Sequence, residues 1–89
     1  MDVEQICREL SNILQRLEKA DTTDKNFSFD VDLFDYGYLD SFGVVELLFE
    51  IKQVFGLDLS HEDFYHDLRS VRLISACIFT KVGKSETKA

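Results

Sequence analysis

The chain has 89 residues and a formal net charge of -7, with 45% hydrophobic and 12% aromatic residues. This length builds one hydrophobic core rather than two, and the apolar content is enough to fold without disulfides. The excess of acids opposes binding to nucleic acid phosphates and to anionic lipid headgroups. It suits partners with basic surfaces, although a charged surface also serves solubility alone.

No segment has the pattern of a secretion signal, and no apolar run reaches the roughly 18 residues of a membrane span. We therefore expect a cytoplasmic protein without membrane insertion. Cys7 and Cys77 lie on the apolar stripes of predicted helices, which favours two reduced thiols over a disulfide.

Apolar residues recur every three or four positions from about residue 3 to 18, which predicts a first helix. Asp2 and Gln5 have the spacing of a capping box at its start. Between residues 21 and 40 apolar and polar residues alternate instead, a pattern typical of a strand. Since a lone strand has no partner in a helical chain, we expect an extended loop whose phenylalanines cover the end of the bundle. Its unusual length indicates a function.

A broad apolar face predicts a second helix from Ser41 to Phe55, ended by Gly56. Ser60 is expected to cap a short third helix over residues 61–66, and the fourth helix to start near Ser70. The prediction is an all-α four-helix bundle with three long helices and one short helix. The folded domain spans residues 1–83, and residues 84–89 form a flexible tail.

Asp40 and Ser41 lead from the long loop into the most apolar helix. Serine and aspartate are preferred N-cap residues, so a purely structural role is one explanation of this pair. His61 and His66 lie among acids but five residues apart, so they do not share a helix face and no metal site is predicted.

A wider string surrounds this pair: Asp32-Leu33-Phe34-Asp35-Tyr36-Gly37-Tyr38-Leu39-Asp40-Ser41-Phe42-Gly43, then Val45-Glu46-Leu47 and Val54-Phe55-Gly56. It resembles the attachment region of the phosphopantetheine-dependent carrier proteins. The Gly-x-x-Asp-Ser spacing and the Asp-Leu-Phe-Asp segment are most similar to the D-alanyl carrier and related stand-alone aminoacyl carriers. The resemblance extends from about Val3 to Val82.

The resemblance implies a non-catalytic carrier domain in residues 1–83, with 4'-phosphopantetheine from coenzyme A attached to Ser41. A phosphopantetheinyl transferase would install this arm with Mg2+ held partly by Asp40. The arm would hold an acyl or aminoacyl group as a thioester. The other implied partners are an adenylating ligase or acyltransferase, which loads the arm, and a downstream acceptor enzyme. We expect a monomer.

Two residues depart from the pattern of fatty-acid carriers. Gly43 stands where those carriers have an acid, and Lys52 lies in a helix that they keep acidic; both favour aminoacyl, peptidyl or specialised acyl pathways. Glu46 and Glu50 are candidate contacts for basic partner surfaces. Phe42 and Phe49 are either apolar partner contacts or core residues.

Two other classes of function stay open. An unmodified helical interaction module is the alternative, because the apolar residues of the second helix exceed a single stripe. A small hydrolase that uses Ser41 ranks below it, since the surrounding string lacks a nucleophile elbow.

Overall fold

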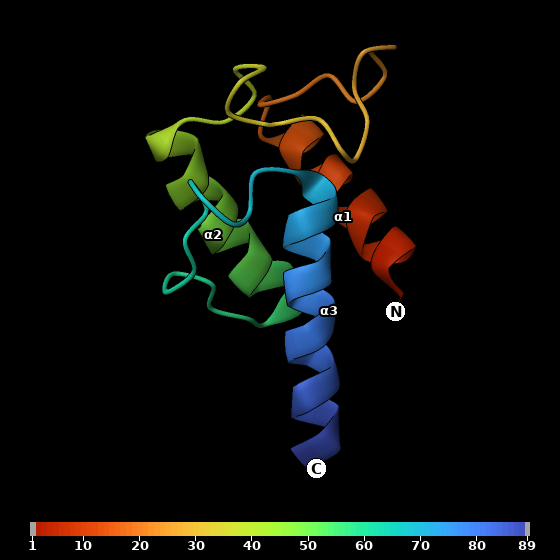
Figure 1. The fold of residues 1–89 in the computed structure, drawn as a ribbon, viewed down its shortest axis with the longest axis vertical. Coiled ribbons are helices and arrows are strands. Elements are labelled where there is room, and N and C mark those ends of the chain that lie inside the picture. The colour runs from red at the N-terminus through yellow and green to blue at the C-terminus, as the bar shows by residue number, and fades with distance from the viewer. Residues whose placement is uncertain (1, 89) are drawn as a thin grey trace.

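A computed structural model of the protein describes residues 2–88, with side chains for residues 2–82. It contains α1 (Val3–Arg16), α2 (Ser41–Phe55) and α3 (Val71–Lys88), and no strand lies within the described range. α1 packs mainly against α3 and more lightly against α2. The long loop, residues 17–40, covers one end of the helices, while α3 extends beyond the other end (Figure 1). The predicted all-α class is confirmed.

The helix ends follow the predicted local signals. Asp2 accepts a hydrogen bond from the Gln5 amide at 2.8 Å while the Gln5 side chain accepts one from the Asp2 amide at 2.8 Å, so the capping box is present. α2 has the predicted bounds, and Gly56 ends it in the left-handed conformation with φ 71°. The Ser70 hydroxyl accepts from the Leu73 amide at 3.1 Å at the start of α3. α1 ends at Arg16, slightly earlier than predicted.

The predicted short helix over residues 61–66 is not confirmed. The second loop, residues 56–70, forms turns and bends in this region, so the described chain has three helices instead of four. The Asp58 carboxylate accepts a hydrogen bond from the Ser60 amide at 2.9 Å, which closes a turn. Ser60, which was expected to cap a helix, is therefore part of this turn. Asp63 closes a further turn by accepting from the His66 amide at 3.1 Å.

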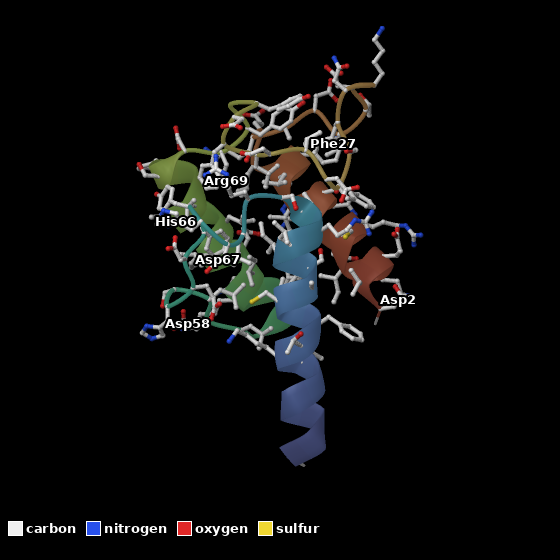
Figure 2. All side chains as sticks on the ribbon, in the orientation of Figure 1. Asp2, Phe27, Asp58, His66, Asp67 and Arg69 are labelled. Atoms are coloured by element: carbon white, nitrogen blue, oxygen red, sulfur yellow. The ribbon has the colours of Figure 1, made fainter. Side chains whose placement is uncertain are left out.

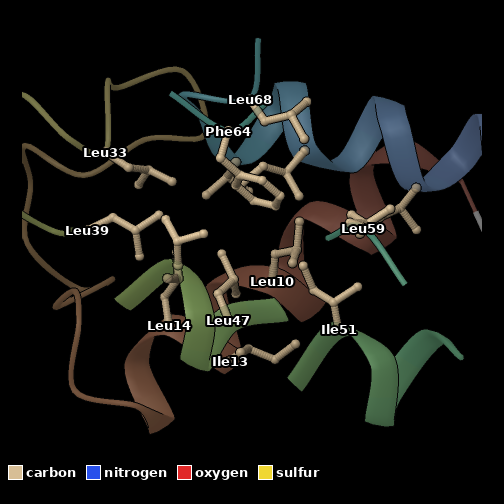
Figure 3. Close-up of a cluster of buried hydrophobic side chains, with 14 of the residues drawn as sticks. Leu10, Ile13, Leu14, Leu33, Leu39, Leu47, Ile51, Leu59, Phe64 and Leu68 are labelled. Carbon is tan, nitrogen blue, oxygen red and sulfur yellow. The ribbon is translucent and has the colours of Figure 1, made fainter. Parts of the chain in front are cut away.

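A single core joins the helices to both loops. Its fully buried side chains from the helices include Leu10, Ile13, Leu14, Leu47 and Ile51, and the loops add Leu33, Leu39, Leu59, Phe64 and Leu68 (Figure 3). Phe27 and Phe29 of the long loop pack against this core while partly buried, as expected for an extended loop. The loops are therefore anchored by apolar side chains and not only by hydrogen bonds.

α3 continues to Lys88, so the backbone of residues 83–88 belongs to this helix. The side chains of the predicted tail, residues 84–89, lie outside the described residues, and the domain boundary at residue 83 stays a prediction. Within the described range, no helix combines the length and the apolar character that a membrane crossing requires.

Candidate functional site

The turn that begins at Asp32 fixes the path of the long loop. One carboxylate oxygen of Asp32 accepts from the amides of Phe34 at 3.0 Å and Asp35 at 2.9 Å. The Arg69 guanidinium donates to both oxygens, at 2.6 Å and 3.1 Å, and lies 5.0 Å from the centre of the Phe34 ring. The hydrogen bond from Arg69 is the largest cause that lowers the pKa of Asp32. Figure 2 shows Arg69 between the two loops.

Backbone hydrogen bonds join the long loop to the second loop and to the start of α3 at the same place. The Leu33 amide donates to the Arg69 carbonyl at 2.7 Å, and the Arg72 amide donates to the Phe29 carbonyl at 2.9 Å. The Leu39 amide donates a hydrogen bond to the Leu33 carbonyl at 3.0 Å, which closes the segment between these two residues into a loop. The chain therefore enters α2 from a fixed direction.

Asp40 is the N-cap of α2, and Ser41 is the first helical residue. The Asp40 carboxylate accepts from the Gly43 amide at 2.7 Å. The helix leaves its first amides without carbonyl partners, so those of Ser41 and Phe42 stay open beyond the Gly43 amide that Asp40 satisfies. Ser41 is exposed. The end of α2 at which it lies is the end that follows the long loop (Figure 1).

The surroundings of Ser41 fit a phosphodiester on its hydroxyl. Open amides and the positive end of the helix dipole favour a negative group at this position, and the exposure leaves room for it. The groove of about 570 Å³ between α1 and the long loop is lined by neither Ser41 nor Asp40. The geometry presents the hydroxyl to other molecules instead of enclosing a substrate.

The two phenylalanines of α2 that sequence left undecided are exposed. Phe42 is 73% and Phe49 60% exposed, so neither belongs to the core. Val45, which sequence reasoning did not name as a partner contact, is 65% exposed between them. Its position three residues after Phe42 and four before Phe49 was the available signal. We call these three residues the apolar stripe.

The predicted acidic contacts already have partners inside the chain. Glu46 lies 2.6 Å from the Lys19 ammonium, and Glu50 lies 2.5 Å from the Arg16 guanidinium. Arg16 is the last residue of α1, and Lys19 lies at the start of the long loop. They are distant in sequence from α2, so no local pattern could have revealed them.

The histidines do not approach one another as ligands. His66 contacts the Asp63 carboxylate at 2.7 Å, a hydrogen bond that lowers the pKa of Asp63, and His61 is exposed. Among the described side chains, no group of three or more histidines, cysteines or acids is arranged to hold a metal ion. Cys7 is buried and Cys77 partly buried, and both are free thiols.

Comparisons with known proteins agree with this geometry. Residues 8–78 match the family described as "Phosphopantetheine attachment site". The chain is similar to the D-alanyl carrier protein of Lacticaseibacillus rhamnosus, with 42% identity over 53 residues, which is 60% of this chain and 63% of that protein. It is also similar to the D-alanyl carrier protein of Bacillus velezensis, with 35% identity over 67% of this chain and 74% of that protein. The match thus spans less than two thirds of the first relative. No solved structure matches significantly.

Proposed function

The chain belongs to the phosphopantetheine attachment site family, and from this premise we propose that it is a carrier protein and not an enzyme. It holds an acyl or aminoacyl group as a thioester on a 4'-phosphopantetheine arm at Ser41 and delivers the group to partner enzymes. The observation that carries this proposal is the exposed hydroxyl of Ser41, placed at the first position of α2 directly after the Asp40 cap.

The residues around Ser41 have separate tasks in this proposal. The open amides of Ser41 and Phe42 and the helix dipole stabilise the negative charge of the phosphodiester. Asp40 fixes the first turn with one oxygen and offers the rest of its carboxylate to the Mg2+ of the attachment reaction. When attached, the arm supplies a thiol on a flexible tether, which raises the local concentration of its cargo at each partner.

We propose an aminoacyl cargo before other acyl groups, because the relatives are named D-alanyl carrier proteins. The partners are a phosphopantetheinyl transferase, an adenylating ligase or acyltransferase, and a downstream acceptor enzyme. Phe42 and Phe49 form the surface that these enzymes approach, whereas Glu46 and Glu50, the acids expected beside them, are each paired with a cation of the same chain. A cytoplasmic location, a monomeric state and a carrier domain of residues 1–83 complete the proposal.

Intact mass measurement after incubation with coenzyme A, Mg2+ and a promiscuous phosphopantetheinyl transferase tests this function. The wild type should gain one phosphopantetheine, and Ser41→Ala should gain none. Ser28→Ala is the matched control, since Ser28 is an exposed serine of the long loop, and it should be modified as the wild type is. An unmodified wild type, or an equal gain by Ser41→Ala, contradicts the proposal.

The exposed apolar stripe supports a second candidate, an unmodified module that binds an amphipathic partner. Protein purified from its own host entirely without a prosthetic group favours this candidate over the carrier.

A further inference from the structure

The apolar stripe runs down α2 from the residue next to Ser41. Phe42 and Phe49 are seven residues apart, so they point in nearly the same direction at a separation of about 10 Å along the helix axis. Val45 lies between them, and all three are exposed. Any enzyme that reaches the Ser41 hydroxyl also approaches Phe42. The stripe is therefore continuous with the position at which partners must act.

On the α1 side of the stripe, the acids are neutralised within the chain. Lys19 contacts Glu46 and Arg16 contacts Glu50, both within 2.6 Å. The stem of Lys19 passes over Gly43, where an added Cβ would lie 3.6 Å from the Lys19 Cε. The hydrogen bond to Glu46 and the charges of Glu46 and Asp40 raise the pKa of Lys19, so its ammonium stays charged.

On the other side of the stripe, the exposed Lys52 has an acid in its vicinity. The pKa of Asp58 is lowered first by its hydrogen bonds from Ser60 and also by the charge of Lys52. Charges on both sides of the stripe thus have counter-charges in the same chain, although the whole protein is strongly acidic. The stripe itself offers apolar area.

We propose that the face of α2 that carries the apolar stripe is electrically neutral toward partners, and that the phosphopantetheinyl transferase acting at Ser41 docks on this stripe through an uncharged, apolar face of its own. Arg16 and Lys19 are internal counter-ions that occupy Glu50 and Glu46. This inference rests on the proposed carrier function. A basic partner residue would exchange one exposed ion pair for another, which yields little net free energy. Burial of two phenylalanine rings is a gain that nothing in the chain already provides.

The test measures the KM of a promiscuous phosphopantetheinyl transferase for this protein with saturating coenzyme A and Mg2+. Phe42→Ser combined with Phe49→Ser should raise KM about tenfold or more, because central aromatic contacts dominate such interfaces. Glu46→Gln combined with Glu50→Gln should leave KM within about twofold. All variants are compared with the wild type by circular dichroism and thermal unfolding.

The dependence on salt gives a second readout. Between about 0.01 and 0.1 M NaCl, where screening of exposed charges increases strongly, the KM ratio of the double glutamine variant to wild type should stay constant. Arg16→Gln combined with Lys19→Gln frees the acids, and this variant should gain a salt dependence that the wild type lacks.

These measurements test the docking inference and the proposed carrier function separately. A KM that rises as much for the glutamine variant as for the serine variant overturns the inference, and so does a serine variant with unchanged KM. A wild type that is not modified at either salt concentration contradicts the proposed carrier function instead. Modification with unequal effects of the two variants, as expected, supports both.

Discussion

Asp32 and Asp40 each begin a turn by accepting a hydrogen bond from a backbone amide, but the two acids serve different purposes. Each accepts a hydrogen bond from the amide three residues later, at 2.9 Å from Asp35 and at 2.7 Å from Gly43. Asp32 is also held by the Arg69 guanidinium through both of its oxygens. Asp40 forms no ion pair within the described side chains and stands next to Ser41. The comparison indicates that an acid fully engaged by protein serves the fold, whereas an acid with an open oxygen is available for chemistry.

The largest effect on stability is expected at Asp32. Asp32→Ala removes the acceptor of two amides and the partner of Arg69, so its thermal midpoint should fall more than that of Asp40→Ala. Asp32→Asn keeps an acceptor but loses the ion pair, and it should also be less stable than the wild type. Thermal unfolding of these variants checks the order. A larger fall for Asp40→Ala would break the comparison.

The Asp40 carboxylate acts both as a helix cap and as a negative charge, and two substitutions should separate the effects of these two roles. Asp40→Ala removes the cap, which costs about 1 kcal/mol and lowers the midpoint by about 4–8 °C. Asp40→Asn keeps a good cap, so its stability should match the wild type, but it loses the carboxylate charge that binds Mg2+ in the proposed attachment reaction.

Modification of Asp40→Asn should consequently slow by about tenfold or more, since even outer contacts of a metal site are worth about 10–100-fold. Rates from intact mass measurements, together with thermal unfolding, check both halves of this prediction. Modification at the wild-type rate would mean that Asp40 serves only as a cap.

The Asp32 contribution should depend on pH. Its pKa in the folded protein lies below the ordinary value of 3.8, first because of the hydrogen bond from Arg69. Its stabilising effect is then present above pH 3.8 and is lost as the pH falls through the folded value. The stability difference between wild type and Asp32→Asn should be constant near neutral pH and shrink in acid. A difference that grows in acid would contradict the assignment.

The smallest effect is expected for Gly43→Ala. The new Cβ would meet the Leu39 Cδ1 at 3.1 Å and the Asp40 carboxylate oxygen at 3.3 Å, both tight contacts with side-chain ends. The higher helix propensity of alanine, worth about 1 kcal/mol, offsets this strain. The thermal midpoint should therefore change less than for Asp40→Ala. A larger fall would show that the turn at Asp40 requires glycine at this position.

Sequence predicted the parts of the fold that local signals determine. The Asp2–Gln5 capping box, the Ser41–Phe55 helix and the left-handed Gly56 all depend on neighbours within a few residues. The region of residues 61–66 was predicted as a helix because Ser60 and Asp63 resemble a helix start. There, the buried Leu59, Phe64 and Leu68 hold the backbone against the core in successive turns, so tertiary packing prevails over the local signal.

The position of Ser41 was predictable, but the character of its surroundings was not. α2 is apolar on most of its circumference, so periodicity could not say whether Phe42 and Phe49 face the core or solvent. The cations that neutralise Glu46 and Glu50 come from distant residues, and only the packing of α1 and the start of the long loop against α2 brings them together. The charge of this face thus depends on ion pairs that no motif contains.

The most direct test of the central claim is to locate the prosthetic group in protein purified from its own host. Trypsin releases residues 26–52 as one peptide, because no lysine or arginine lies between Lys25 and Lys52, and its only serines are Ser28 and Ser41. Fragmentation by tandem mass spectrometry should place phosphopantetheine on Ser41. A peptide that carries the group on Ser28, or that is wholly unmodified, would contradict the account.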